Sequence, residues 1–187
     1  MKINIFVYYL AFVGIAITAL SCNNDDTMTP NEPEVITTAI LSLVPEGGTE
    51  SINLVWRDLD GDGANPPEIT GDTLAANTRY TTALILLNET TNPAINITAE
   101  ILLEDIEHQA FYNTTVSGMT ILYNDMDIQG YPLGLEMEVN TGGPSGGTIN
   151  VVLRHMPDKA AEGVAQGNIA NANGETDLNV DFPVTVL

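Results

Sequence analysis

The sequence predicts an all-β fold, a single antiparallel β-sandwich of immunoglobulin-like type that occupies residues 34–187. Apolar and polar residues alternate with a period of two over short segments, as they do in half-buried strands. Clusters of Gly, Pro and Asn separate these segments at short intervals, which is typical of sandwiches and barrels. The apolar content of 44% is sufficient for one domain with a normal core.

Seven segments carry the strand pattern in chain order, at residues 35–44, 52–56, 79–87, 118–123, 133–139, 149–153 and 178–186. The segment at 79–87 is apolar on both faces toward its end, so we expect it to be a central strand. The last segment contains Pro183, which has no N–H to donate to a ladder. We therefore expect this strand at an edge, with Pro183 facing outward.

Two segments have a less regular pattern. Residues 95–107 fit either a helix or a strand that enters a short irregular turn, because Ile97 and Ile101 are spaced for both. The alternation from Ile95 onward makes the strand the favoured interpretation. Residues 142–147 are rich in glycine and lie between two expected strands, so we expect a hairpin loop there rather than a phosphate-binding loop.

The chain is strongly acidic, with 25 Asp and Glu against 5 Lys and Arg and a formal net charge of −20. Such a charge repels nucleic acid and anionic lipid surfaces, which argues against a nucleic-acid partner. It favours cations and cationic partners, although it also simply keeps a protein in solution. Cys22 is the only cysteine, so we expect stability to come from core packing, with a bound metal ion as a further contribution, rather than from disulfides.

The N-terminus has the pattern of a secretory signal peptide over residues 1–21, with a basic start, an apolar run and small residues before Cys22. Residues 19–22 (Ala-Leu-Ser-Cys) resemble the lipobox of bacterial lipoproteins, in which the mature chain begins at a lipidated cysteine. The resemblance implies that Cys22 is acylated and anchors the protein in a membrane. An N-terminal transmembrane anchor is the alternative.

Residues 22–33 comprise this cysteine and a polar, acidic segment with two prolines, which we expect to be a flexible tether. Asp25 and Asp26 resemble the acidic export tag of Bacteroidetes-type lipoproteins. That resemblance implies a lipid-anchored, surface-exposed protein of the outer membrane, with the periplasmic face as the alternative.

The acidic run at residues 58–63 (Asp-Leu-Asp-Gly-Asp-Gly) is the strongest metal-site candidate in the sequence. Carboxylates at alternate positions can surround one calcium ion, and glycine permits the sharp turn. The run resembles the start of an EF-hand loop, but Ile69 stands where the bidentate glutamate should be. The pattern predicts a calcium-stabilised β loop, and a solvated acidic turn is the alternative. The expected ligands are Asp58, Asp60 and Asp62, completed by Glu68 or Asp72.

The two histidines suggest a second metal site. His155 continues the apolar face of the strand at residues 149–153, and His108 precedes an apolar segment. Imidazole is a ligand for zinc, copper and iron, and a thioether binds copper(I) or haem iron. If their strands are neighbours, the two histidines can share a transition-metal ion or a haem, with further ligands from Met119, Met156 or Glu107. Two hydrogen-bonded structural histidines are the alternative.

Catalytic residues are not expected, and we predict that the protein is not an enzyme. Acylation of Cys22 leaves no cysteine nucleophile, and the sequence lacks the Gly-x-Ser-x-Gly and His-Glu-x-x-His patterns. A second acidic turn at residues 124–130 lies between two expected strands of opposite direction. We expect it to be a hairpin loop.

Four motifs, at residues 56–63, 88–90, 107–109 and 153–155, resemble a group of small uncharacterised Bacteroidetes-type lipoproteins. Some members are labelled type 1 periplasmic binding fold proteins, a label that implies a large two-lobed α/β molecule and disagrees with the β pattern here. Such lipoproteins often work beside TonB-dependent transporters. The resemblance therefore implies a non-enzymatic ligand- or metal-binding module that is accessory to nutrient uptake. A structural or adhesive surface domain stabilised by calcium is the alternative.

Overall fold

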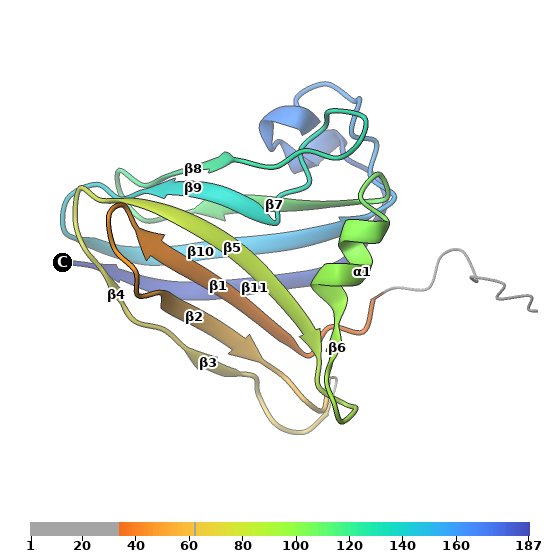
Figure 1. The fold of residues 1–187 in the computed structure, drawn as a ribbon, viewed down its shortest axis with the longest axis horizontal. Helices are drawn as coiled ribbons and strands as arrows, with labels where there is room; N and C mark the ends of the chain where they lie inside the picture. The colour runs from red at the N-terminus through yellow and green to blue at the C-terminus, as the bar shows by residue number, and fades with distance from the viewer. Residues whose placement is uncertain (1–33, 62) are drawn as a thin grey trace, which may run out of the picture. The chain divides into compact units, whose positions relative to one another are not determined.

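The computed structural model describes residues 34–61 and 63–187, which belong to one compact unit, Glu32–Leu187. Two β-sheets pack against each other in this unit (Figure 1), and the prediction of an all-β sandwich is confirmed. The expected signal peptide, Cys22 and the tether lie outside the described residues. Within the described ranges, no helix is long and apolar enough to cross a membrane.

The larger sheet contains seven strands: β1 (Thr38–Pro45), β2 (Ile52–Arg57), β3 (Glu68–Thr70), β5 (Arg79–Asn88), β6 (Ile95–Asn96), β8 (Thr120–Tyr123) and β9 (Glu136–Asn140). Their order is β3-β2-β1-β5-β9-β8, and β6 pairs with β5. β5 lies between β1 and β9, which confirms that residues 79–87 form a central strand.

The smaller sheet contains four strands: β4 (Thr73–Leu74), β7 (His108–Thr114), β10 (Ser145–His155) and β11 (Glu175–Val186). Their order is β4-β11-β10-β7, and only β4 runs parallel to its neighbour. β4 pairs with no more than Thr185 and Val186 of β11. β11 is therefore not the outermost strand of its sheet, contrary to the expectation, because β4 lies beside its last residues. The rest of that side of β11 pairs with no described strand, and Pro183 is exposed, as expected.

Alternate residues of the strands form the core between the two sheets. On β10, Ile149, Val151 and Leu153 are buried and the residues between them are partly exposed. On β11, every second residue from Leu178 to Val186 is buried. Burial of each such aliphatic side chain contributes about 1.5–3 kcal/mol relative to an exposed position. The alternation therefore determines which face of each sheet points inward.

The favoured interpretation of residues 95–107 as a strand is wrong, because residues 97–103 form the helix α1 (Ile97–Leu103). Only the two residues of β6 are extended. The side chain of Asn96 caps the helix by accepting a hydrogen bond from the N–H of Ala99. Ile97 and Ile101 lie one turn apart and are both buried. The helix therefore buries the same two apolar residues whose spacing also fits a strand.

Of the two predicted hairpin loops, one is confirmed by the structure and the other is wrong. Residues 124–130 lie in the connection between β8 and β9, which pair antiparallel, as predicted. The glycine-rich segment at residues 142–147 is not a hairpin, because β9 belongs to the larger sheet and β10 to the smaller one. Glycine is required at this crossing, since a Cβ on Gly142 would lie 3.0 Å from the Cα of Gly118.

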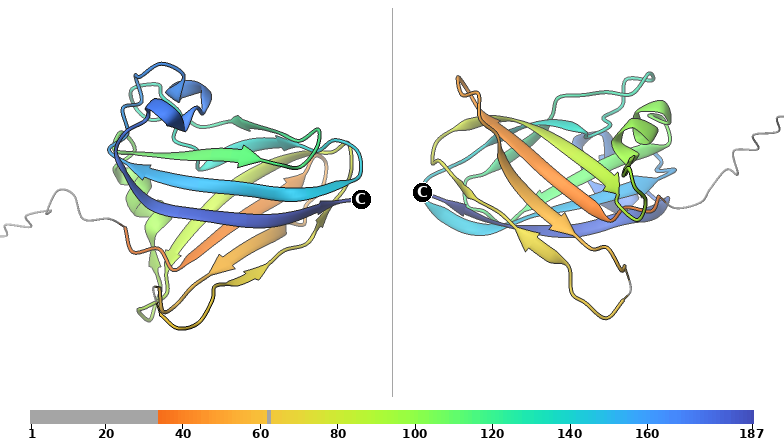
Figure 2. Two further views of the ribbon diagram at one scale, coloured as in Figure 1. Left: turned by 180° about the vertical axis from the view of Figure 1, so that it is seen from behind. Right: turned by 60° about the horizontal axis from the view of Figure 1, so that its bottom comes forward.

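The connection between β10 and β11 covers part of the smaller sheet beside β7 (Figure 2, left). It contains two short 3-10 helices, η1 (Val164–Gln166) and η2 (Ile169–Asn171). Val164 and Ala172 of this connection bury Phe111 of β7 in a small second cluster. Gln109 and Phe111 on the outward face of β7 are thereby removed from solvent, whereas Asn113 on the same face is exposed.

A buried ion pair attaches this connection to two other loops. The Lys159 ammonium donates hydrogen bonds to the Asp127 carboxylate at 2.8 Å and to the Asp105 carbonyl at 2.6 Å. Burial raises the pKa of Asp127, but the hydrogen bonds from Lys159 and the N–H of Tyr131 outweigh this effect and leave the pKa below its usual value. Lys159 thus joins the β10–β11 connection to the segment after α1 and to the β8–β9 loop.

Replacement of Lys159 should strongly destabilise the fold. In Lys159→Met, Asp127 keeps its buried charge and loses its partner, so the free energy of unfolding should fall by about 3–5 kcal/mol in urea titrations. Arg79→Met is the matched control, because Arg79 is a half-exposed cation 3.6 Å from Glu138. The control should cost less than about 1 kcal/mol. Equal small losses in both variants would contradict the structural importance of Lys159.

Candidate functional site

The two histidines lie directly opposite each other on neighbouring strands. His155 at the end of β10 pairs with His108 at the start of β7. Their rings are stacked, with centroids 4.7 Å apart and planes inclined by 10°. Both residues are buried, with 0% exposure for His108 and 5% for His155. The structure therefore brings together the two residues that the sequence analysis could only propose as partners.

Asp177 of β11 completes a cluster with these histidines, and a β-bulge places it there. The β10–β11 register pairs Leu153 with Leu178 but Arg154 with Thr176, so Asp177 is an extra residue without a partner on β10. A bulge changes the direction of a side chain relative to the pleat. The Asp177 side chain is accordingly 0% exposed, although its odd position on β11 would otherwise place it toward solvent.

The ligand atoms of this cluster are close together and unpaired. One ring nitrogen of each histidine and one carboxylate oxygen of Asp177 all lie within 4.8 Å of one another, and His108 Nε2 is 3.6 Å from Asp177 Oδ2. His108 Nε2, His155 Nδ1 and both carboxylate oxygens of Asp177 are buried without a hydrogen-bond partner among the described residues. Unpaired buried polar atoms are costly, so such a concentration at one point makes this cluster the candidate site.

The protonation state of His108 suits metal binding. Its Nδ1 lies 3.3 Å from the carbonyl oxygen of Glu104, which can only accept a hydrogen bond. Neutral His108 therefore carries its proton on Nδ1 and presents the Nε2 lone pair toward Asp177. Burial lowers the pKa of His108 to about 4, so the ring is neutral at pH 7.

The carboxyl group of Asp177 is also perturbed. Burial raises its pKa to about 6, and the nearby His155 only partly opposes this effect. At pH 7 the group is largely ionised and faces the lone pair of His108, an arrangement that a bound cation would stabilise. At pH 5 it is largely protonated and can instead donate a hydrogen bond to His108 Nε2.

Further carboxylates surround the cluster. Glu34 and Glu104 are partly buried and form a second group of potential ligands with His108, again within 4.8 Å of one another. Glu107 lies 3.9 Å from His155 Nε2, as the sequence analysis proposed for a further ligand. Four acidic residues thus lie at or beside two imidazoles, which makes the site attractive to cations.

The distances and donor types fit a small metal ion. Zinc bonds of about 2.0–2.1 Å to imidazole nitrogen and about 2.0–2.2 Å to carboxylate oxygen place two tetrahedral ligand atoms roughly 3.3–3.6 Å apart. The 3.6 Å between His108 Nε2 and Asp177 Oδ2 is at the upper end of this range, and all three donors lie within 4.8 Å of one another, so side chains would have to move closer to hold an ion. Two imidazoles and a carboxylate are donors that zinc and divalent iron accept.

Neither proposed thioether ligand belongs to this cluster of unpaired donors. The sulfur of Met119 accepts a hydrogen bond from Thr114, at the opposite end of β7 from His108. Met156 follows His155 directly, but its side chain is 47% exposed. The donor set is therefore one of nitrogen and oxygen.

The predicted calcium loop forms a different arrangement. Asp58 and Asp60 lie just after β2, Asp62 lies outside the described residues, and Glu68 and Asp72 are exposed on or beside β3. Asp60 Oδ2 accepts hydrogen bonds from the backbone and side-chain nitrogens of Asn65. Within the described part of the chain, no three acidic residues of this loop come as close together as the histidine cluster does. Calcium binding here stays a prediction.

A cavity of about 650 Å³ lies beside the cluster. Its lining includes Glu34 and Asp177, and also Asp58, Asp60 and Gly61 of the acidic turn after β2. Neither histidine lines this cavity, so Asp177 is the one member of the cluster at its wall.

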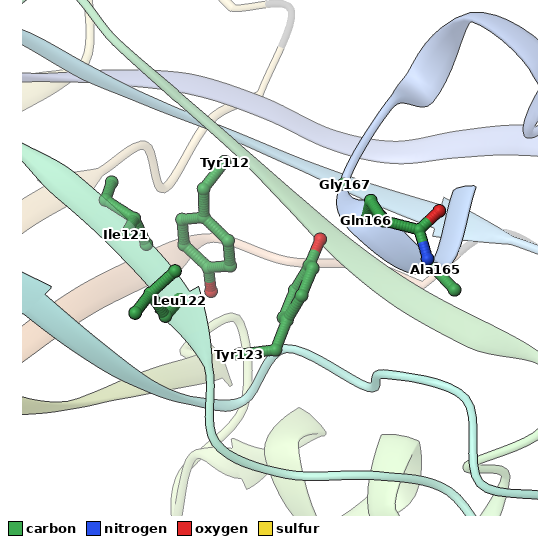
Figure 3. A pocket seen from close by; sticks show the side chains of 7 residues that line it. All are labelled: Tyr112, Ile121, Leu122, Tyr123, Ala165, Gln166 and Gly167. Carbon is green, nitrogen blue, oxygen red and sulfur yellow. The ribbon is translucent and has the colours of Figure 1, made fainter. Parts of the chain in front are cut away.

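A second cavity, of about 360 Å³, lies between β7, β8 and η1 (Figure 3). Its walls include the rings of Tyr112 and Tyr123, which meet edge to face with centroids 6.3 Å apart. Both hydroxyl groups already donate hydrogen bonds, from Tyr112 to the Gly134 carbonyl and from Tyr123 to the Ala110 carbonyl. The tyrosine hydroxyls at this cavity are therefore satisfied, whereas the histidine cluster offers unpaired donors.

Asp177→Asn should stabilise the metal-free protein at pH 8. The raised pKa of Asp177 means that its stability contribution is present below about pH 4 and is lost as pH rises through about 6. Asparagine carries no charge and can donate to His108 Nε2, so we expect a gain of about 1–3 kcal/mol at pH 8 and little change at pH 4. Urea unfolding in a chelator measures both values. Asp181→Asn, an exposed change on the same strand, should show no such pH-dependent gain.

No protein-family model matches the chain, and no curated protein or solved structure matches it either.

Proposed function

We propose that the protein is a surface lipoprotein whose β-sandwich binds one divalent transition-metal ion through His108, His155 and Asp177. The observation that carries this proposal is the set of buried, unpaired donor atoms on these three residues, all within 4.8 Å of one another. A binding role, without catalysis, accounts for this cluster. A bare ion fits it better than haem does, because His108 is fully buried and faces a carboxylate at 3.6 Å.

The cellular role follows from the N-terminal sequence and the net charge. A signal peptide at residues 1–21 and an acylated Cys22 would hold the domain at the outer membrane through the segment at residues 22–33. A charge of −20 concentrates cations near the protein and disfavours nucleic acid. We propose that the domain serves nutrient uptake at the cell surface, with a TonB-dependent transporter as the partner.

A structural or adhesive surface domain stabilised by calcium is the second candidate. The supporting observation is Asp58 Oδ1, which is buried without a hydrogen-bond partner among the described residues, next to Asp60. A calcium ion held by Asp58, Asp60 and Asp62, with Glu68 or Asp72, would stiffen the loop between β2 and β3. Such an ion would leave the two histidines without a role in binding.

Metal titration of the full-length protein separates these two candidates. We expect one zinc or cobalt ion per chain, with an increase in melting temperature of several degrees when free zinc exceeds Kd by 100-fold. His155→Ala should abolish this increase, because it removes one of the three buried donors. Met156→Ala is the matched control, since it changes the exposed neighbour of His155 and should retain binding.

Two results would contradict the transition-metal proposal. Full zinc affinity in His155→Ala would show that the ion binds elsewhere. Binding of calcium alone, equal in wild type and His155→Ala and lost in Asp58→Asn, would establish the calcium loop as the metal site.

The lipid anchor is tested by Cys22→Ser. Serine has no thiol for thioether formation, so the variant should carry no acyl chain and should leave the membrane fraction. Mass spectrometry of the mature chain and membrane fractionation measure the two effects. Acylation and membrane retention in Cys22→Ser would disprove the anchor, and a control change of the neighbouring Asn24 to Ser should leave both intact.

A further inference from the structure

Glu34 lies where the segment before β1 approaches the histidine cluster. Its carboxylate is within 4.8 Å of ligand atoms of Glu104 and His108. The backbone just after it is fixed to the larger sheet, because the N–H of Thr37 donates to the Leu87 carbonyl at 3.0 Å and Thr37 Oγ1 accepts from the N–H of Glu89 at 2.8 Å. Glu34 therefore lies only three residues before the point at which Thr37 is hydrogen-bonded to the larger sheet.

We propose that Glu34 is the fourth ligand of the metal ion, so that the ion joins the segment before β1 to the smaller sheet. This inference rests on the proposed metal site at His108, His155 and Asp177. Four protein ligands, two nitrogens and two oxygens, suit the tetrahedral coordination that zinc prefers. A site closed in this way keeps no open position for a substrate, in agreement with a role in binding.

The charges around Glu34 support its assignment as the fourth ligand of the metal ion. Burial raises the pKa of Glu34, and the neighbouring carboxylates of Glu100, Glu104 and Asp177 raise it further. A divalent cation among these groups relieves their repulsion. Glu104 is the competing ligand, but its backbone carbonyl already orients His108 and its position at the C-cap of α1 ties it to the helix.

A consequence for the whole protein follows from the place of Glu34 in the chain. His108, His155 and Asp177 all belong to the smaller sheet, whereas Glu34 leads into β1 of the larger sheet. The ion would thus bridge the two layers of the sandwich. It would also fix the point at which the preceding segment, which begins at Cys22, enters the folded domain.

The test compares Glu34→Gln with Glu104→Gln and with Glu46→Gln, an exposed change in the turn after β1. Zinc affinity of the full-length proteins is measured by competition with a chromophoric chelator, and coordination is read from the visible absorption of the cobalt-loaded forms. Glu34→Gln should weaken zinc binding by at least about tenfold and reduce the intense cobalt bands of four-coordinate geometry. Glu104→Gln should have a smaller effect and Glu46→Gln none.

Hydrogen exchange provides a second measurement that does not depend on affinity. In the wild type, saturating zinc should slow exchange of the Val35 and Ile36 amides, and in Glu34→Gln saturating zinc should not. Wild-type affinity, cobalt spectrum and exchange in Glu34→Gln, together with lost binding in His155→Ala, would overturn the role of Glu34 and leave the metal site standing. Absence of any zinc binding in the wild type would overturn both proposals.

Discussion

The fold depends on a strict alternation of inward and outward side chains in a protein that has no disulfide to support it. Every strand pair contributes to the core only if its register keeps the apolar residues on one face, since a shift by one residue would expose them all. On β11 this alternation holds from Leu178 to Val186 and ends at the bulge. Among the described strand pairs, the one break in register therefore occurs where a carboxylate, rather than an aliphatic side chain, is turned inward.

The protein contains two groups of buried charged or titratable residues, and these differ in how far their polar atoms are hydrogen-bonded. Lys159 and Asp127 satisfy each other and the surrounding backbone, and they hold three connections together. His108, His155 and Asp177 are buried to a similar degree but leave four ring or carboxylate atoms unpaired. A buried group that only serves the fold is expected to be satisfied within it. The difference between the two groups distinguishes a satisfied structural network from the cluster that we propose as a binding site.

Alternation was sufficient to predict the sandwich, because burial of one face per strand is the main local signal in the sequence. The central strand was predicted instead from the apolar residues on both faces of residues 79–87. Alternation failed at α1, where Ile97 and Ile101 fit two periods and the cap at Asn96 favoured the helix. The pairing of His108 with His155 depends on which strands are neighbours, which local pattern does not contain. Asp177 was missed because alternation along β11 places its side chain on the outer face. Only the bulge turns this side chain inward. The acidic loop after β2 was visible in the sequence, but Asp62 lies outside the described residues and the loop's ligation stays a prediction.

The three residues of the cluster come from three different strands, and this determines when during folding the cluster can form. His108, His155 and Asp177 are far apart in the chain and meet only after β7, β10 and β11 have paired, so the unfolded chain holds no ready-made cluster of donors. Contacts of such long sequence separation form late, after their loop-closure entropy has been overcome. If the cluster binds a metal ion as proposed, ion capture is deferred until folding is complete. In that case the compartment in which the domain folds, rather than the one in which it is synthesised, decides which metal it meets.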